Sequence, residues 1–189
     1  SAYMGVARAR MSGEEPYTIS AIQGLAKILH VPGLLDDAEV KVYCEYFAET
    51  VAQNCDLNDN IRNEALKALQ GAIEVYSDAV IGATLPAFDQ AFPAELTDLF
   101  GSSADNGDIA LTLLASMGDL FAKSSRFSSL LTFLEQKLHT VFRSQGQRPA
   151  MFVLSGILYA LEQHEKHGLD IKQVDATERD TLAAFARRL

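Results

Sequence analysis

The apolar residues of this chain recur with the period of an α-helix along most of its length. Residues 61–76 carry their apolar side chains on one face of a helix with 3.6 residues per turn. These side chains are Ile61, Ala65, Ala68, Leu69, Ala72, Ile73 and Tyr76. Residues 40–51 and 127–142 repeat the pattern, and no segment alternates apolar and polar residues convincingly. The sequence therefore predicts an all-α fold.

Helix start and stop signals divide this pattern into nine expected helices. Thr18 is a candidate N-cap, and Asp36 with Glu39 has the spacing of a capping box. Pro86 falls inside an expected helix, where it removes a backbone donor. The longest connection expected between helices is 93–105. The expected helices span residues 2–11, 18–30, 36–53, 59–76, 77–92, 106–122, 125–144, 148–166 and 175–188.

Four of these helices share a short apolar and small-residue motif that ends in glycine. The glycines are Gly24, Gly71, Gly118 and Gly156, spaced 47, 47 and 38 residues apart. A glycine inside a helix costs about 1 kcal/mol relative to alanine, so close approach of a neighbouring helix is the simplest reason for four of them. Chance coincidence is the alternative. On this interpretation Gly71→Leu would destabilise the fold by overpacking.

The glycine spacing predicts helix pairs of roughly 40–47 residues, the period of HEAT and armadillo repeats. Two helices per period favour HEAT repeats. We therefore expect one domain, residues 1–189, built as an α-solenoid of about four HEAT-like antiparallel helix pairs. The expected repeats are residues 1–33, 34–76, 77–123 and 124–167, with a partial repeat at 168–189.

The last expected helix has an apolar stripe of Leu182, Phe185 and Leu189, where a complete solenoid would carry a polar cap. We therefore expect an internal fragment of a longer solenoid. The alternative is a complete small protein with unusual ends.

The charge of the chain is negative overall and unevenly distributed. The net charge of −9 argues against nucleic acid as a direct ligand. Residues 68–122 contain eight acidic residues and no Lys, Arg or His. Within them, Asp98, Asp105 and Asp108 form a candidate acidic surface for a basic protein partner. The alternative is that these carboxylates only keep the surface solvated.

The residues that could carry chemistry are few. Cys44 and Cys55 are too few for an iron–sulfur cluster, and Cys44 is expected in the core. His164 and His167 lack partners at metal-ligand spacing. No nucleotide-binding or nucleophile motif occurs. We therefore expect no catalytic residue, cofactor or metal site. Two cysteines and no visible secretory signal fit a reducing compartment, and no apolar run suits a membrane helix.

The order of several short segments resembles a known family. The segments are Ala21–Leu25, Gly33–Val40, Asn63–Leu69, Thr84–Phe88, Leu113–Leu138 and Ser155–Glu162. Together they resemble the large HEAT-repeat targeting subunit of the cytosolic iron–sulfur protein assembly machinery, whose older name refers to methyl methanesulfonate sensitivity, nucleotide excision repair and transcription. The resemblance covers most of residues 17–165, and its weight lies in the order and spacing of the segments.

The resemblance implies a non-catalytic scaffold of the cytoplasm and nucleus. Its implied partners are a WD-repeat protein, a small subunit and iron–sulfur apo-proteins of DNA replication, repair and transcription. Another HEAT-repeat scaffold, of the nuclear transport receptor or phosphatase regulatory subunit type, is the second interpretation. A small all-α enzyme or ligand-binding protein is the third.

Overall fold

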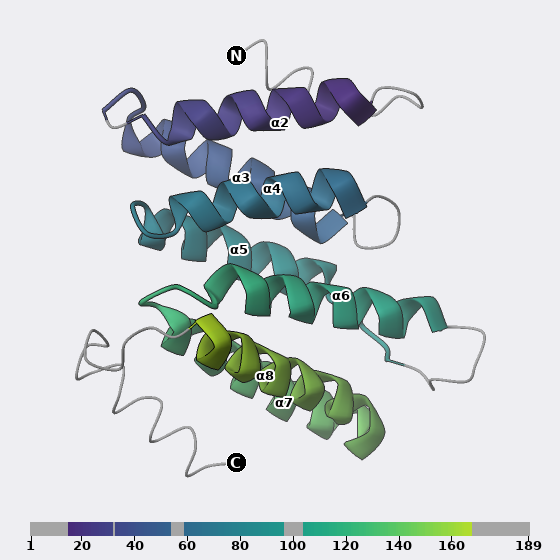
Figure 1. Ribbon diagram of the computed structural model, residues 1–189. Helices are drawn as coiled ribbons and strands as arrows, with labels where there is room; N and C mark the ends of the chain where they lie inside the picture. The colour runs from purple at the N-terminus through teal and green to yellow at the C-terminus, as the bar shows by residue number, and fades with distance from the viewer. Residues whose placement is uncertain (1–14, 32, 54–58, 97–103, 168–189) are drawn as a thin grey trace. The chain divides into compact units, whose positions relative to one another are not determined.

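The computed structural model describes residues 15–31, 33–53, 59–96 and 104–167 (Figure 1). All regular structure in these residues is helical, which confirms the all-α fold. The helices are α2 (Glu15–Leu29), α3 (Asp37–Gln53), α4 (Asp59–Ala72), α5 (Ser77–Ala91), α6 (Ala104–Phe121), α7 (Phe127–Gln145) and α8 (Gln147–His167). The helices expected at 2–11 and 175–188 lie outside the described residues.

The chain divides into two compact units, Ser1–Ala91 and Phe92–Leu189. The first unit contains α2 to α5, and the second contains α6 to α8. The division falls inside the expected repeat 77–123, between its two helices.

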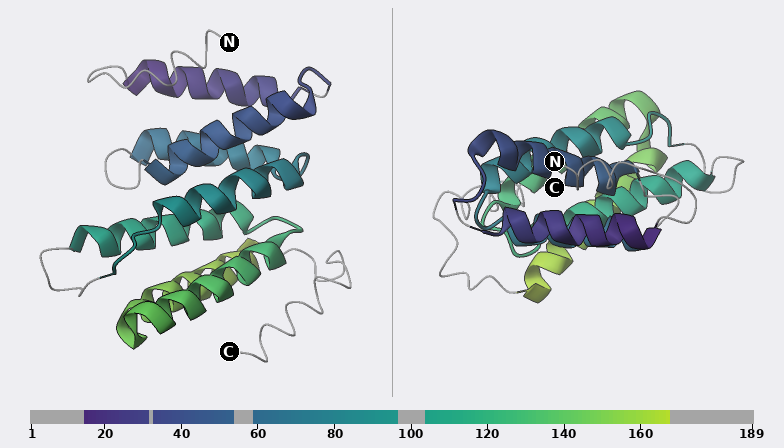
Figure 2. Two further views of the ribbon diagram at one scale, coloured as in Figure 1. Left: turned by 180° about the vertical axis from the view of Figure 1, so that it is seen from behind. Right: turned by 90° about the horizontal axis from the view of Figure 1, so that it is seen from above.

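In the first unit, alternate helices pack together as two layers. Helix α2 packs on α4, α3 packs on α5, and α3 also packs on α4. Figure 1 shows α2 and α4 on the near side, and the reverse view in Figure 2 brings α3 and α5 to the front. The largest fully buried side chains of this unit come from all four helices. They are Ile22, Leu25, Leu29, Phe47, Leu69 and Phe88.

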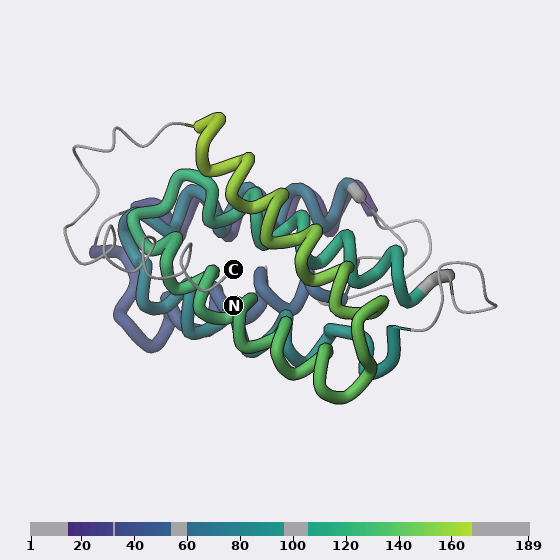
Figure 3. Tube along the Cα trace, turned by 90° about the horizontal axis from the view of Figure 1, so that it is seen from below, coloured from purple at the N-terminus to yellow at the C-terminus, as the bar shows by residue number. Residues whose placement is uncertain are grey.

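The second unit has the same pattern with one helix fewer. Helix α8 packs on both α6 and α7. Figure 3 shows α7 and α8 running back alongside each other from their tight connection. Gly146, which ends α7, has φ 89°, a left-handed conformation that favours glycine. The largest fully buried side chains are Leu113, Leu114, Met117, Leu120, Phe121 and Phe127.

Some expected helix ends are confirmed and others are wrong. The backbone N–H of Glu39 donates to Asp36 Oδ1 over 2.8 Å, and that of Asp36 donates to Glu39 Oε2 over 3.1 Å, so the capping box is present. Thr18 is not an N-cap, because α2 begins at Glu15 and Thr18 is buried within it. Pro16, a residue favoured in a first helical turn, explains the earlier start.

Helix α4 ends at Ala72, four residues before the expected end. The N–H groups of Val75 and Tyr76 both donate to the carbonyl of Ala72, over 3.1 and 2.8 Å, and form the turn that leads into α5.

The connection expected at 93–105 is one residue shorter, because α5 ends at Ala91 and α6 begins at Ala104. Hydrogen bonds hold its first residues. Gln145, at the end of α7, accepts from the N–H of Leu96 over 2.8 Å and donates to the carbonyl of Ala94 over 2.8 Å. The Asn106 amide donates to the carbonyl of Glu95 over 3.2 Å. Leu96 is buried, so this part of the connection belongs to the core of the second unit.

Contacts between alternate helices join residues about one repeat apart. Between α2 and α4, Gln23 donates to Glu64, 41 residues on, and Asn60 donates to Glu15, 45 residues back. Because the partners advance together along both helices, α2 and α4 are parallel.

Helices α6 and α8 show the same relation. The Tyr159 hydroxyl donates to Asp119 over 2.8 Å, 40 residues away, and His164 Nδ1 lies 2.9 Å from the carbonyl of Ala122, 42 residues away. The partners again advance together along the two helices, so α6 and α8 are parallel as well.

Two of the four motif glycines lie at a close contact between α6 and α8. A Cβ at Gly156 would lie 2.8 Å from Cβ of Leu114, and a Cβ at Gly118 would lie 3.2 Å from Cα of Ala160. These contacts involve backbone or backbone-bound atoms, so the neighbouring helix would have to move. The expected role of glycine in close packing is confirmed at both positions.

Gly71 has a different environment. It is exposed, and the atoms nearest to an added Cβ belong to the ring of His30, which is itself exposed. The expectation that Gly71→Leu would destabilise the fold by overpacking stays a prediction, and its first contact would be with a side chain and not with backbone. The four glycines are also not equivalent, since Gly156 faces Leu114 and not Gly118.

We expect Gly156→Ala to lower the free energy of unfolding by about 1–3 kcal/mol, because the new methyl group overpacks Leu114. Gly82→Ala is the matched control, since Gly82 is exposed in α5 and has no atom within 4 Å of its Cβ position. That control should gain up to about 1 kcal/mol from helix propensity. Urea unfolding measures both, and equal effects of the two substitutions would contradict the close contact.

Candidate protein-binding surface

The structure leaves most of the predicted acidic surface undescribed. Asp98 and the side chain of Asp105 lie outside the described residues, and Asp108 is exposed near the start of α6. Nothing in the described residues brings these three side chains together, so the acidic surface stays a prediction.

Other acidic residues of 68–122 separate into two kinds. Glu74, Asp78, Asp89 and Glu95 are exposed. Asp119 is half-buried and accepts the hydrogen bond of Tyr159. Burial first, then the hydrogen bond to Asp119, raises the pKa of Tyr159 to about 12. Asp119 therefore has a structural role in the contact between α6 and α8.

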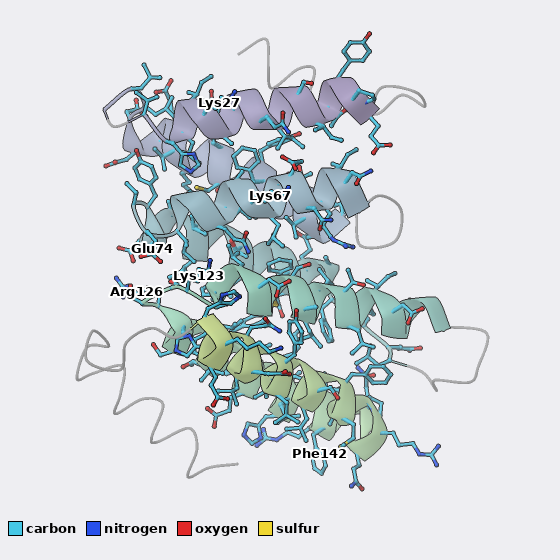
Figure 4. All side chains as sticks on the ribbon, in the orientation of Figure 1. Lys27, Lys67, Glu74, Lys123, Arg126 and Phe142 are labelled. Carbon is cyan, nitrogen blue, oxygen red and sulfur yellow. The ribbon has the colours of Figure 1, made fainter. Side chains whose placement is uncertain are left out.

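The layer formed by α2 and α4 in the first unit carries both positive and negative side chains. Lys27 and Lys67 lie on α2 and α4 (Figure 4). Lys67 Nζ lies 2.6 Å from Glu64 Oε1, and Gln23 donates to the other oxygen of Glu64. These hydrogen bonds, that from Lys67 first, lower the pKa of Glu64. On α4, Lys67 and Glu64 therefore form a pair of opposite charges that satisfy each other.

Helices α3 and α5 form a groove of about 180 Å³ on the first unit. Its residues are Glu45 and Glu49 from α3, with Gly82, Ala83, Pro86, Ala87 and Gln90 from α5. Glu45 and Glu49 are one helical turn apart, so both carboxylates lie on the same side of α3. The α5 side consists mainly of small residues, which leaves the space that larger side chains would fill.

Pro86 removes one backbone donor from the α5 side of this groove. Helix α5 continues through Pro86, which has no N–H to donate to the carbonyl of Gly82 four residues earlier. Gly82 and Pro86 both line the groove. The groove lining therefore contains two carboxylates and the amide of Gln90, and it includes no Lys, Arg or His.

Sequence analysis did not identify this groove. In the sequence, Pro86 indicates only the loss of a backbone donor inside a helix. Glu45 and Glu49 lie outside the acidic stretch 68–122. One feature of the sequence could have indicated the groove. Four small residues of α5 recur at the spacing of one helical face: Gly82, Ala83, Pro86 and Ala87.

Cys44 is a buried core residue, as expected. Its side chain is fully buried in α3, and burial, with the charge of Glu45 second, raises the pKa of its thiol to about 11. The thiolate form that binds metals or attacks electrophiles is therefore disfavoured at neutral pH. Cys55 lies outside the described residues.

His164 has structural contacts on two sides. Its ring stacks on Phe127 with centroids 4.0 Å apart, and its Nδ1 lies 2.9 Å from the carbonyl of Ala122. In the described part of the chain, no three His, Cys, Asp or Glu side chains gather as a metal site. Nor does any described helix combine the length and hydropathy needed to cross a bilayer.

Comparisons with known proteins identified no relative. No family model matches the chain, and neither a curated protein nor a solved structure does.

Tyr159→Phe should remove the hydrogen bond to Asp119 and destabilise the chain by about 1 kcal/mol at pH 7. Because the pKa of Tyr159 is raised from 10 to about 12, its stabilising effect is fully present below pH 10 and is lost as the pH rises toward 12. The stability difference between the original chain and Tyr159→Phe should therefore shrink over that range. Urea unfolding at pH 8 and pH 11 measures it, with the exposed Tyr17→Phe as control.

In a Cys55→Ser variant, we expect the remaining thiol of Cys44 to react very slowly with a disulfide reagent at pH 8. Burial and the raised pKa both keep the thiolate population low. In urea the same thiol should react at the rate of a free cysteine. Rapid reaction of the folded protein would show that Cys44 is accessible.

Proposed function

We propose that this chain is a HEAT-repeat α-solenoid segment that acts as a non-catalytic protein-binding scaffold. The observation that carries this proposal is the constant offset between alternate helices. In both units, parallel helices contact each other through residues 40–45 positions apart. A two-helix unit repeated with that period produces such an offset at every level.

The packing within each unit supports the same arrangement. Helices α3 and α4 pack together within the expected repeat 34–76, and α7 and α8 do so within 124–167. The α3–α5, α2–α4 and α6–α8 contacts are those that stacking of successive pairs requires. Within each unit, the helices of a pair bury their apolar faces against the helices of the neighbouring pair, as repetition requires.

We further propose that the scaffold works in the delivery of iron–sulfur clusters to apo-proteins of DNA replication, repair and transcription, in the cytoplasm and nucleus. This part depends on the resemblance of the segments between Ala21 and Glu162 to the HEAT-repeat targeting subunit. The expected partners are a WD-repeat protein, a small subunit and the apo-protein clients. The chain itself would hold no cluster, in keeping with its two cysteines.

A second candidate is a HEAT-repeat scaffold of the transport receptor or phosphatase regulatory type. The acidic α3–α5 groove favours it, because an acidic solenoid surface suits a basic cargo signal. The identity of the captured proteins separates the two candidates.

Affinity capture from cell extract, followed by mass spectrometry, tests the pathway. We expect the folded chain to retain the WD-repeat subunit or iron–sulfur apo-proteins. The control is the same chain coupled to the resin after denaturation, which keeps its composition and charge but not its fold. Capture of transport cargo or phosphatase subunits in place of these proteins would support the second candidate.

A further inference from the structure

Three of the exposed large apolar side chains lie on α7 and α8. Phe142 is 56% exposed, Met151 52% and Leu158 58%. Leu158 follows Gly156 by two residues, a rotation of about 200° around the helix axis, so the two lie on opposite sides of α8. Met151 lies almost two full turns before Leu158 and falls on the same side. Because Gly156 meets Leu114 of α6, Met151 and Leu158 face away from α6.

Further apolar residues extend this surface along both helices. Figure 4 shows Phe142 at the edge of the α7–α8 pair that lies farthest from α6. Half-buried Leu138 lies one turn before Phe142, and half-buried Leu154 and Leu161 flank Leu158 on α8. Apolar side chains gathered in this way on two packed helices indicate a contact surface, whereas scattered ones would not. The outer apolar face consists of Leu138, Phe142, Met151, Leu154, Leu158 and Leu161.

The offset of one repeat identifies the part of the chain that belongs on this face. In the three pairs of alternate helices, α2 with α4, α3 with α5 and α6 with α8, the two helices begin 44, 40 and 43 residues apart. Applied to α7, the same offset places residues 182–186 beside Phe142. This stretch contains Leu182 and Phe185, two large apolar residues.

The sequence of residues 175–188 has the features of a helix with one apolar side. Asp175 and Glu178 have the spacing of a capping box, and no Pro or Gly follows them. The large apolar residues recur three and four positions apart, which places them on one face of a helix. They are Leu182, Phe185 and Leu189. Such a face needs an apolar partner, and the outer apolar face supplies one at the expected offset.

The connection from α8 is long enough for this placement. Near the end of α8, His164 stacks on Phe127 at the start of α7, with centroids 4.0 Å apart. A helix that follows α8 after a short connection therefore begins beside the start of α7 and can run parallel to it. The connection 168–174 can reach roughly 25 Å. That reach exceeds the spacing of about 8–10 Å between the axes of packed helices.

We propose that residues 175–188 form a helix that packs parallel to α7 and covers the outer apolar face. This inference rests on the one-repeat offset of the proposed solenoid, and it assigns the occupant of one surface. The outer apolar face is then a contact within the chain. Partner proteins of the scaffold therefore bind to other surfaces of the second unit.

A single tryptophan in the full chain tests the contact. The chain contains no tryptophan, so Phe185→Trp introduces the only indole. We expect its emission maximum to lie at shorter wavelength in native buffer than in urea, because the contact removes the indole from water. Acrylamide should quench it several-fold less in native buffer than in urea. Equal emission and equal quenching in the two conditions would overturn the proposal.

Substitutions on the outer apolar face test where the indole is buried. In the Phe185→Trp chain, Phe142→Asp should shift the emission to longer wavelength and raise quenching several-fold, and Leu158→Asp on α8 should act in the same direction. Both side chains are exposed, so the described helices should persist, and circular dichroism checks this. The matched control is Tyr17→Asp, which replaces an exposed aromatic residue of the first unit and should change neither signal.

The outcomes of these substitutions separate the possible positions of the segment. An indole that stays buried in both the Phe142→Asp and the Leu158→Asp chain would overturn the proposed surface. Exposure by Leu158→Asp alone would place the segment on α8 and overturn the parallel packing on α7. An equal effect of Tyr17→Asp would show that any added acidic residue exposes the indole, and it would likewise reject the assignment.

Dilution distinguishes the same chain from a second copy as the occupant. We expect the emission maximum of the Phe185→Trp chain to be independent of protein concentration, with a monomer in sedimentation experiments. An emission that moves to longer wavelength on dilution, as a dimer dissociates, would assign the outer apolar face to a second copy and overturn the proposal.

The contact and the proposed pathway fail separately. A buried indole, without targeting subunits or apo-proteins in the capture experiment, would keep the contact and reject the pathway. Capture of those proteins by a chain whose indole is fully exposed in native buffer would keep the pathway and reject the contact.

Discussion

The structure depends on side-by-side contact between parallel helices that are separated by one intervening helix. In each unit this contact buries the apolar faces that a single helix pair cannot cover alone. Between α6 and α8 the contact is close, because Gly156 faces Leu114 and Gly118 faces Ala160. Polar pairs at the same interface, such as Tyr159 with Asp119, fix which residues lie opposite one another. Apolar burial thus provides the stability, and the glycines and polar pairs determine the register.

The sequence predicted the helical class and most helix positions because both depend on local signals. Apolar periodicity identifies each helix, and the Asp36–Glu39 box and Gly146 identify helix ends through chemistry within a few residues. Thr18 was misassigned because a cap residue and a buried helical threonine look alike in sequence. The end of α4 was also placed too late, because the apolar pattern continues through the turn to Tyr76.

Contacts between helices were harder to predict than the helices themselves. The glycine motif predicted close packing, and this is confirmed at Gly118 and Gly156, while the nearest neighbour of Gly71 is the exposed ring of His30. Sequence spacing does not show which face of a helix its neighbour covers. The α3–α5 groove was missed for the same reason, since its acidic and small residues come from helices about 40 positions apart and meet only after packing.

The one-repeat offset also affects how the chain can fold as it is made. The long-range hydrogen bonds described above join residues between 40 and 51 positions apart, so none of these bonds links the two ends of the chain. Because the entropic cost of closing a loop grows with its length, a contact across one repeat costs less to close than a contact between the ends of the chain would. We therefore expect each helix to be able to contact its partner once one further repeat has been synthesised. Newly made apolar faces therefore remain uncovered only briefly during synthesis, which limits the time available for aggregation.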